Sequence, residues 1–238
     1  MFEVRQVESL VEQARVREIF DSIWPAAGQS QVTSNLLQAM VHSGAYVVGV
    51  YDCDQPAQPM IGASFAFPAI EPEIHLHSHM TGFLEGYRDR GLGTQVKMHQ
   101  WHWAKEHCYA SITWTFDPLV SRNAKFNLHK LGADFISYEP NFYGVMEDAL
   151  NAGEQTDRIL ARWDLQTENP APKRLHSHYP DSARTIEIPE DVVALRQQNP
   201  AKSAEIRLRV REQFQEALAS GYKVSAFTPD NRYILERP

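Results

Sequence analysis

A strand-like run at Ile74–Leu84 leads through a turn containing two glycines directly into a helical run from about Gly93 to His107. A strand that ends in a tight turn and continues as a helix is typical of folds in which helices pack on a sheet. This junction therefore places the chain among the folds that combine strands and helices, and its turn is a candidate binding element.

The order of the other runs narrows the fold class. It predicts an α+β fold with a mixed central sheet flanked by helices, and not a doubly wound parallel sheet. Strands are expected at Phe2–Gln6, Ala45–Tyr51, Met60–Phe67, Ile74–Leu84, Ser111–Phe116, Phe135–Val145 and Ile159–Leu165, and helices at residues 10–24, Val32–Val41, Gly93–His107 and Ala124–Leu131.

Charge and proline content divide the chain into two parts. Residues 1–165 carry a net charge of −8, whereas residues 166–238 carry +1. Residues 166–181 hold three prolines and show no apolar periodicity, which is typical of a linker. We therefore expect a main domain at residues 1–165, a linker at 166–181 and a small α+β subdomain at 182–238.

The expected C-terminal subdomain begins with a strand at Thr185–Ile188 and a short helix opened by Pro189. A longer helix follows, and a hairpin formed by Tyr222–Thr228 and Arg232–Glu236 closes the chain. The series Arg207, Arg209 and Arg211 does not fall on one face of the long helix, which predicts a solvated helix and not an anion site.

Composition excludes several classes of protein. The chain has 238 residues, is 43% hydrophobic and carries a net charge of −7, which favours a globular protein and disfavours nucleic-acid binding. No apolar run reaches the roughly 18 residues of a membrane span, and no signal peptide is evident. Cys53 and Cys108 form neither a disulfide framework nor a thiolate metal motif. We expect a cytoplasmic protein that binds small molecules and no membrane.

The turn Tyr87–Thr94 has the features of a phosphate site. A turn entering a helix presents unpaired N–H groups at the positive end of the helix dipole, and Gly91 and Gly93 let a phosphate approach the main chain. Arg88 and Arg90, with Lys97 one helical turn later, add positive charge. Two glycines can also simply make a tight turn. The Rossmann and Walker patterns are both incomplete here.

Arg88-x-x-Gly91-x-Gly93 after an apolar strand resembles the Arg/Gln-x-x-Gly-x-Gly/Ala signature of the GNAT superfamily of acyl-CoA-dependent N-acyltransferases. The order of elements from Phe2 to Leu165 is similar to that fold, and Asn123–Ala133 resembles its second motif. More narrowly, the segments Leu76-His77-Ser78-His79-Met80, Phe116-Asp117-Pro118 and Ser121-Arg122-Asn123-Ala124 resemble a subgroup of predicted GNAT acyltransferases with an extra C-terminal part.

The resemblance implies a cosubstrate and a place for it. Acetyl-CoA or succinyl-CoA is the expected acyl donor, because members of the subgroup are associated with amino-acid N-acylation, including N-succinylation. The pantetheine arm would pair with main-chain groups of the first strand of a splayed pair, and no metal is expected. The implied cofactor-binding residues are Phe83, Leu84, Arg88, Arg90, Gly91, Leu92, Gly93, Thr94 and Asn123.

Three alternating histidines, His75, His77 and His79, precede the turn and project from one face of the predicted strand. Histidine titrates near neutrality, so one of them can serve as the general base that deprotonates an amine. The resemblance favours His77 first and His79 second. Two alternatives stay open, a solvated face of a sheet and a zinc site of His-x-His type completed by another ligand.

The general acid is less well indicated. Many GNAT members carry a tyrosine where this chain has Leu128, so that assignment does not transfer. Tyr143, on the expected later strand, is the substitute candidate, and Asn123 is either a helix cap or a ligand. The expected catalytic set is therefore His77, His79 and Tyr143.

These inferences predict an N-acyltransferase that moves an acetyl or succinyl group to a small-molecule amine, with an amino acid as one candidate acceptor and a homodimer as one candidate state. A non-catalytic acyl-CoA sensor is the first alternative, because the usual tyrosine is absent at Leu128. A His-dependent metal hydrolase is the second. The acceptor, the donor and the role of the C-terminal part are not determined by the sequence.

Overall fold

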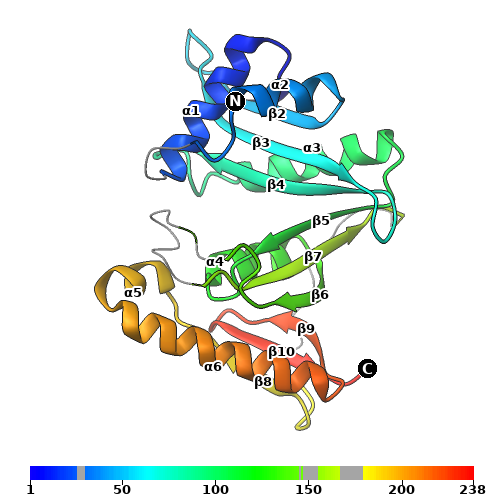
Figure 1. The fold of residues 1–238 in the computed structure, drawn as a ribbon, viewed down its shortest axis with the longest axis vertical. Coiled ribbons are helices and arrows are strands. Elements are labelled where there is room, and N and C mark those ends of the chain that lie inside the picture. The colour runs from blue at the N-terminus through cyan, green and yellow to red at the C-terminus, as the bar shows by residue number, and fades with distance from the viewer. Residues whose placement is uncertain (26–29, 145, 147–154, 167–178) are drawn as a thin grey trace. The chain divides into compact units, whose positions relative to one another are not determined.

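The computed structural model describes residues 1–25, 30–144, 146, 155–166 and 179–238. Its strands form a seven-stranded sheet in the order β1-β2-β3-β4-β5-β7-β6 and a separate three-stranded sheet in the order β8-β10-β9 (Figure 1). The chain divides into two compact units, one made of residues 1–113 and 164–166 and the other of residues 114–163 and 167–238.

The first unit is built on a mostly antiparallel sheet. β1 (Phe2–Gln6), β2 (Tyr46–Asp52), β3 (Met60–Ala69) and β4 (His75–Phe83) pair antiparallel in sequence. β4 then pairs in parallel with the start of β5 (Ser111–Phe116), at Leu76 with Ile112 and at His77 with Thr113. These two register pairs join β4 and β5 among the described residues, and the splay between the two strands that the resemblance implies stays a prediction.

Helices cover both faces of this sheet. α1 (Leu10–Ile23) and α2 (Ser34–His42) pack on one face, where Ile19, Phe20 and Leu37 meet apolar side chains of β2 and β3. α3 (Leu92–Glu106) packs on the other face through Leu92 and Val96. Because both faces are covered, every residue of β2 is buried, and this strand reads as a continuous apolar run in the sequence.

The second unit continues from β5. A short helix α4 (Ser121–Ala124) leads into a π-helical segment η1 (Lys125–Lys130), and β6 (Asp134–Glu139) pairs antiparallel with β7 (Arg158–Asp164). The elements β8 (Arg184–Glu187), α5 (Val192–Gln198), α6 (Pro200–Ala219), β9 (Lys223–Phe227) and β10 (Arg232–Glu236) complete it. Phe214 of α6 stacks on Tyr138 of β6 at 4.8 Å between ring centroids and forms the core of this unit.

The predicted fold class is confirmed, with local corrections. β6 ends at Glu139 and does not reach the predicted Val145, because Pro140 and Asn141 begin a turn in which Asn141 adopts a positive φ of 49°. The predicted helix Ala124–Leu131 is largely π-helical. The boundary between the two compact units falls within β5, after Thr113. The linker proposed at residues 166–181 lies largely outside the described residues and stays a prediction.

Candidate active site

The turn between β4 and α3 is open to solvent and built from left-handed main-chain positions. Gly91 is the N-cap of α3 with φ 77°, and Gly86 and Asp89 have φ 86° and 61°. A Cβ added at Gly91 would meet no atom within 4 Å. Arg88 and Arg90 are exposed beside it. The first N–H groups of a helix have no acceptor within the helix, so this turn can accept an anion.

A hydrogen-bond network ties this turn to the β2–β3 hairpin. The hydroxyl of Tyr87 donates to Asp52 Oδ2 at 3.2 Å, and Gln55 donates to the same carboxylate at 2.9 Å. The hydrogen bond from Gln55 is the main reason that the pKa of Asp52 lies below its usual range. The guanidinium of Arg90 lies 5.1 Å from the centre of the Tyr87 ring. Tyr87 therefore fixes the base of the turn and supports one of its arginines.

The first helical turn of α3 contains the other predicted binding residues. Leu92 is buried in the core, and Gly93 and Thr94 are half-buried. The Thr94 amide donates to the Gly91 carbonyl at 3.1 Å, whereas its buried Oγ1 has no hydrogen-bond partner among the described residues. A buried hydroxyl without a hydrogen-bond partner is unusual in a folded protein.

Lys97 does not contribute to the positive charge of the turn, which corrects the prediction. The residue is 6% exposed, and its Nζ donates to Ser78 Oγ at 2.9 Å and to Gln100 Oε1 at 3.3 Å. Burial lowers the pKa of Lys97 to about 7. Its ammonium thus lies beneath β4, on the face covered by α3, and is only partly charged at neutral pH.

The end of β4 offers main-chain groups for an amide-bearing ligand. The Leu84 amide donates to the Ile61 carbonyl at 2.9 Å, so this amide is already paired, and the assignment of Phe83 and Leu84 to the cofactor stays a prediction. Phe83 pairs in register with Gly62, and this pair lies next to the hydrogen-bonded pair of Leu84 and Ile61. Because hydrogen-bonded and non-bonded pairs alternate in an antiparallel ladder, the main-chain groups of Phe83 point away from β3.

His77 and His79 share one face of β4, and His75 differs from them. His77 and His79 lie 6.1 Å apart between ring centroids, and both contact Phe67, at 5.2 and 5.7 Å. His75 is 7% exposed, and its Nδ1 is paired with the Glu73 carbonyl at 2.8 Å. His75 is therefore a structural residue, and His77 and His79 remain the candidates for catalysis.

A β-bulge explains how His79 is presented. In the ladder of β3 and β4, Phe65 pairs with Met80 and Ala66 with Ser78, so His79 is an extra residue inserted between two register pairs. A bulge of this kind re-aims side chains and is common near functional sites. The sequence contains no local signal for it, because the extra residue is defined by the pairing of β4 with β3.

The environment of His77 makes it a neutral and weak base. Its Nδ1 lies 3.1 Å from Thr113 Oγ1, which fixes the orientation of the ring. The pKa of His77 is lowered to about 4, mainly by burial and to a smaller extent by the nearby charges of His79, His75 and Lys97. Burial also lowers the pKa of His79, although part of its side chain reaches solvent. Both rings are thus unprotonated at neutral pH, as a proton acceptor must be.

The end of α1 lies close to the histidine-bearing strand. A Cβ added at Gly82 of β4 would come within 2.6 Å of Ile23 Cδ1 and 3.0 Å of the Trp24 ring. Glycine at this position permits the close approach of α1 and β4. The strand that carries His77 and His79 is therefore bordered by apolar side chains of α1.

In the second unit, Tyr143 lies on a turn and not on the predicted strand. Its side chain is 39% exposed, and its hydroxyl is hydrogen-bonded to Thr115 Oγ1 of β5 at 3.0 Å. Asn123 is half-buried within α4 and is not the helix cap, which is Val120. Leu128 is 3% exposed and belongs to the core. The exposed hydroxyl of Tyr143 keeps it a candidate for proton transfer.

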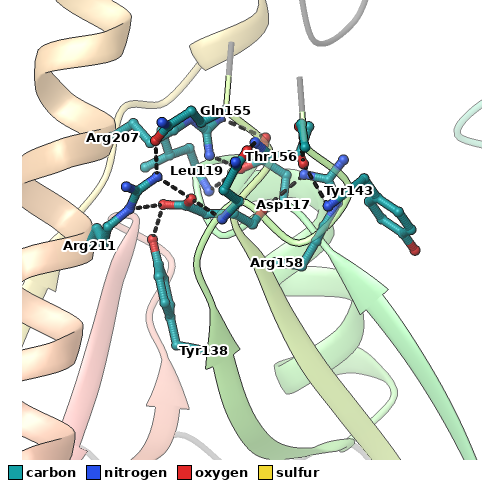
Figure 2. Close-up of polar contacts among 12 residues, drawn as sticks. Asp117, Leu119, Tyr138, Tyr143, Gln155, Thr156, Arg158, Arg207 and Arg211 are labelled. Carbon is teal, nitrogen blue, oxygen red and sulfur yellow. Dashed lines mark hydrogen bonds and ion pairs between the residues drawn. The ribbon is translucent and has the colours of Figure 1, made fainter. Parts of the chain in front are cut away.

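Sequence reasoning missed a buried ionic network in this unit (Figure 2). Asp117, of the Phe-Asp-Pro segment, forms ion pairs with Arg196 of α5 and Arg207 of α6. Burial alone would raise the pKa of Asp117, but the guanidinium groups of Arg207 and Arg196 outweigh it and lower the value to about 2. The prediction of a solvated helix is therefore wrong for Arg207, which is 3% exposed, whereas Arg209 is exposed as predicted. The spacing of Arg207 and Arg211, four residues apart on one helical face, was the available signal.

Within residues 1–25, 30–144, 146, 155–166 and 179–238, no group of three His, Cys, Asp or Glu side chains is arranged to hold a metal ion. In the same residues, no helix is long and apolar enough to cross a membrane.

Comparison with solved structures identifies the architecture. Arabidopsis thaliana NAA60 in complex with a bisubstrate analogue matches with a TM-score of 0.58 and 15% identity, over 69% of this chain and 99% of that chain. A putative acetyltransferase of the GNAT family from Desulfovibrio desulfuricans matches with a TM-score of 0.54 and 14% identity, over 69% and 99%. This chain has the GNAT fold. The ribosomal-protein-S18-alanine N-acetyltransferase from Escherichia coli is also similar, with a TM-score of 0.51 and 12% identity, over 75% and 99%.

The GNAT fold confirms the architecture that Arg88, Gly91 and Gly93 suggested. No protein-family model and no curated protein sequence matches the chain, so the likeness is one of structure at low sequence identity. The subgroup suggested by Leu76–Met80 stays a prediction.

Proposed function

We propose that the protein is an acyl-CoA-dependent N-acyltransferase. The observation that carries the proposal is the open, left-handed turn at Gly91, which begins α3 at the end of β4 on a GNAT fold. The amides at the start of α3 would bind the diphosphate of CoA, and Arg88 and Arg90 would neutralise its charge. The hydroxyl of Thr94, unsatisfied within the described part of the chain, would donate to a phosphate oxygen.

The free edge of β4 supports a path for the pantetheine arm. The main-chain groups of Phe83 point away from β3, and an extended amide chain can pair with them as an added strand does. His77 precedes Phe83 by six residues, which is roughly 20 Å along an extended strand. An arm that runs along this edge from the turn at Gly91 would bring its thioester toward His77 and His79.

The reaction proposed is direct transfer of the acyl group. His77 or His79 accepts a proton from the ammonium group of the acceptor, and the neutral amine attacks the thioester carbonyl. As the C–S bond breaks, CoA leaves as the thiolate, and the second proton lost by the nitrogen passes to solvent. Tyr143 donates its hydroxyl proton to this thiolate, and Thr115, to which that hydroxyl is hydrogen-bonded, orients it. No covalent enzyme intermediate is required.

The donor and the acceptor are proposed as classes. Acetyl-CoA and succinyl-CoA are the candidate donors. The acceptor is a primary amine, either an amino acid or another small molecule, in the cytoplasm. Several proteins of similar fold act on, or are bound to, peptide or protein substrates, such as the NatC complex with a Gag peptide, so a peptide N-terminus belongs in the acceptor panel.

The experiment that tests the proposal compares Gly91→Ala with Gly44→Ala. Gly44 and Gly91 share a φ of 77°, and a Cβ added at either would meet no atom within 4 Å, so both substitutions impose a similar backbone strain of about 1–2 kcal/mol. We expect acetyl-CoA or succinyl-CoA to raise the melting temperature of the wild-type protein and of Gly44→Ala. The Gly91→Ala variant should lose about tenfold or more in affinity by calorimetry.

Two results would count against this assignment. Wild-type affinity in Gly91→Ala would place the CoA diphosphate elsewhere, and equal losses in both variants would trace the effect to strain. Failure of the wild-type protein to bind any acyl-CoA would remove the function itself.

A non-catalytic acyl-CoA sensor is the second candidate, and one observation favours it. Leu128, where many GNAT members carry a tyrosine that serves as the general acid, is 3% exposed and packs in the core. Release of free CoA in the presence of the amine panel separates the two functions. Tight binding of acyl-CoA without release of the thiol would support the sensor.

A further inference from the structure

The turn that carries Tyr143 is held by hydrogen bonds from a neighbouring segment. The Tyr143 amide donates to Thr156 Oγ1 at 2.9 Å, and the Phe142 amide donates to the Thr156 carbonyl at 2.9 Å. Thr156 Oγ1 in turn donates to the Gly144 carbonyl at 2.7 Å. Asn141 and Gly144 both adopt positive φ, so the turn has one specific shape that these bonds select.

Asp157, the next residue, fixes the start of the same turn. Its carboxylate is completely buried and accepts the Asn141 amide at 2.9 Å and the Tyr138 hydroxyl at 2.6 Å. A buried carboxylate is stable only when a positive charge or several donors satisfy it. The geometry of the turn therefore depends on whatever neutralises Asp157.

That charge comes from the C-terminal helix. Arg211 of α6 donates through Nε to Asp157 Oδ2 at 3.0 Å and through Nη2 to Oδ1, a bidentate pair (Figure 2). Its Nη2 also reaches Gln155 Oε1 at 2.6 Å. The pairing with Asp157 is the main reason that the pKa of Arg211 is raised. A planar guanidinium supplies this geometry, which a lysine cannot.

We propose that Arg211 is a positioning residue that holds the 140–144 turn and thereby places the hydroxyl of Tyr143 for proton transfer. The inference rests on the proposed acyltransferase function and gives the C-terminal helix a role in it. Arg211 does not touch the reacting groups in this scheme, because it acts through Asp157 and the main chain of the turn.

A double-mutant cycle separates positioning from a general structural role. Tyr143→Phe removes the hydroxyl, and Arg211→Lys keeps the charge while losing the bidentate geometry. We expect each single change to lower kcat, Arg211→Lys by roughly tenfold, with the KM for acyl-CoA unchanged. In the Tyr143→Phe background, Arg211→Lys should lower kcat no further. Arg209→Met is the matched control, because Arg209 lies on the exposed face of α6 and donates to the Glu187 carbonyl at 3.1 Å, away from the turn.

A measurement without turnover accompanies the cycle. Amide hydrogen exchange of residues 140–144 should quicken in Arg211→Lys and in the more severe Arg211→Met, and not in Arg209→Met. Unchanged exchange in both Arg211 variants would overturn the inference, as would losses in kcat that simply multiply in the double variant. An inactive wild-type protein would refute the proposed function, whereas unchanged kcat in Tyr143→Phe would refute only the role of Arg211.

Discussion

At the scale of single residues, burial determines which groups can carry a proton at neutral pH. His77, held by Thr113, is kept neutral because its surroundings lower its pKa to about 4. In the unfolded chain His77 becomes protonated near pH 6.5, whereas in the folded chain it becomes protonated only near pH 4. Folding stability should therefore fall as the pH drops between these values. Above them, His77 is fully available as a base.

The lowered pKa of His77 in the folded protein predicts the pH dependence of catalysis. Between about pH 5.5 and 8, the ratio of wild-type to His77→Gln kcat/KM should be constant, because His77 stays unprotonated and the acceptor amine titrates equally in both proteins. The His77→Gln change should lower kcat about 100-fold and leave acyl-CoA affinity intact. Steady-state rates across this range provide the check, with exposed His102→Gln as the control variant.

A ratio that declines below about pH 6.5 would show that His77 titrates as an ordinary histidine does and that its surroundings do not exclude the charged form. If His79→Gln, and not His77→Gln, causes the loss of turnover, the residue on the bulge is the base.

At the scale of elements, the proposed CoA site depends on a loop anchored at both ends. Gly91 and the helix dipole supply the binding groups, but Tyr87 joins the turn to Asp52 at the end of β2. The turn is thereby preorganised before any ligand arrives, which reduces the entropy lost on binding.

Tyr87→Phe tests this anchor by removing one hydroxyl while keeping the ring beneath Arg90. We expect affinity for acyl-CoA to fall about fivefold to tenfold, since one hydrogen bond to a charged group is lost. Rates with a pantetheine thioester, which lacks the diphosphate, should not change. Tyr51→Phe is the control, because that hydroxyl also donates to a carboxylate, Glu12 at 3.0 Å, away from the turn. Equal effects on both thioesters would argue against the anchor.

The elements themselves were largely predictable, and the reason lies in local patterns. The alternating residues of β4 and the glycines beside α3 carry their signals within a few positions. The bulge at His79, the burial of Lys97 and the end of β6 at Glu139 depend on partners far along the chain, so no local pattern could reveal them. The same holds for Arg207 and Arg211, whose acidic partners lie 90 and 54 residues away.

At the scale of the whole molecule, the additional C-terminal segment is joined to the rest of its unit by buried charges. NAA60 is matched over 99% of its length by only 69% of this chain, so a substantial part of this protein has no counterpart there. In the second unit, Asp117 forms ion pairs with Arg196 of α5 and Arg207 of α6. The Tyr233 hydroxyl of β10 donates a hydrogen bond to the Pro118 carbonyl at 2.7 Å.

This arrangement predicts that Asp117→Asn destabilises the protein by about 3–5 kcal/mol, because two buried guanidinium groups lose a carboxylate that both of them contact. Urea denaturation at neutral pH measures the change in the free energy of unfolding. Asp230→Asn is the comparison, since the Asp230–Arg232 ion pair is exposed to solvent and its loss should be nearly neutral. Similar losses in the two variants would mean that the Asp117 cluster contributes little to holding the C-terminal helices.

The inserted residue in β4 has a consequence for how such a protein can evolve. Ala66 pairs with Ser78 and Phe65 with Met80, so deleting position 79 would close the bulge and leave the register on both sides of it unchanged. His77 would keep its face of the strand, and Ser78 would keep its contact with Lys97 on the opposite face. A single codon lost from this strand would therefore remove one imidazole from its chemical surface while leaving the hydrophobic sheet around it unchanged.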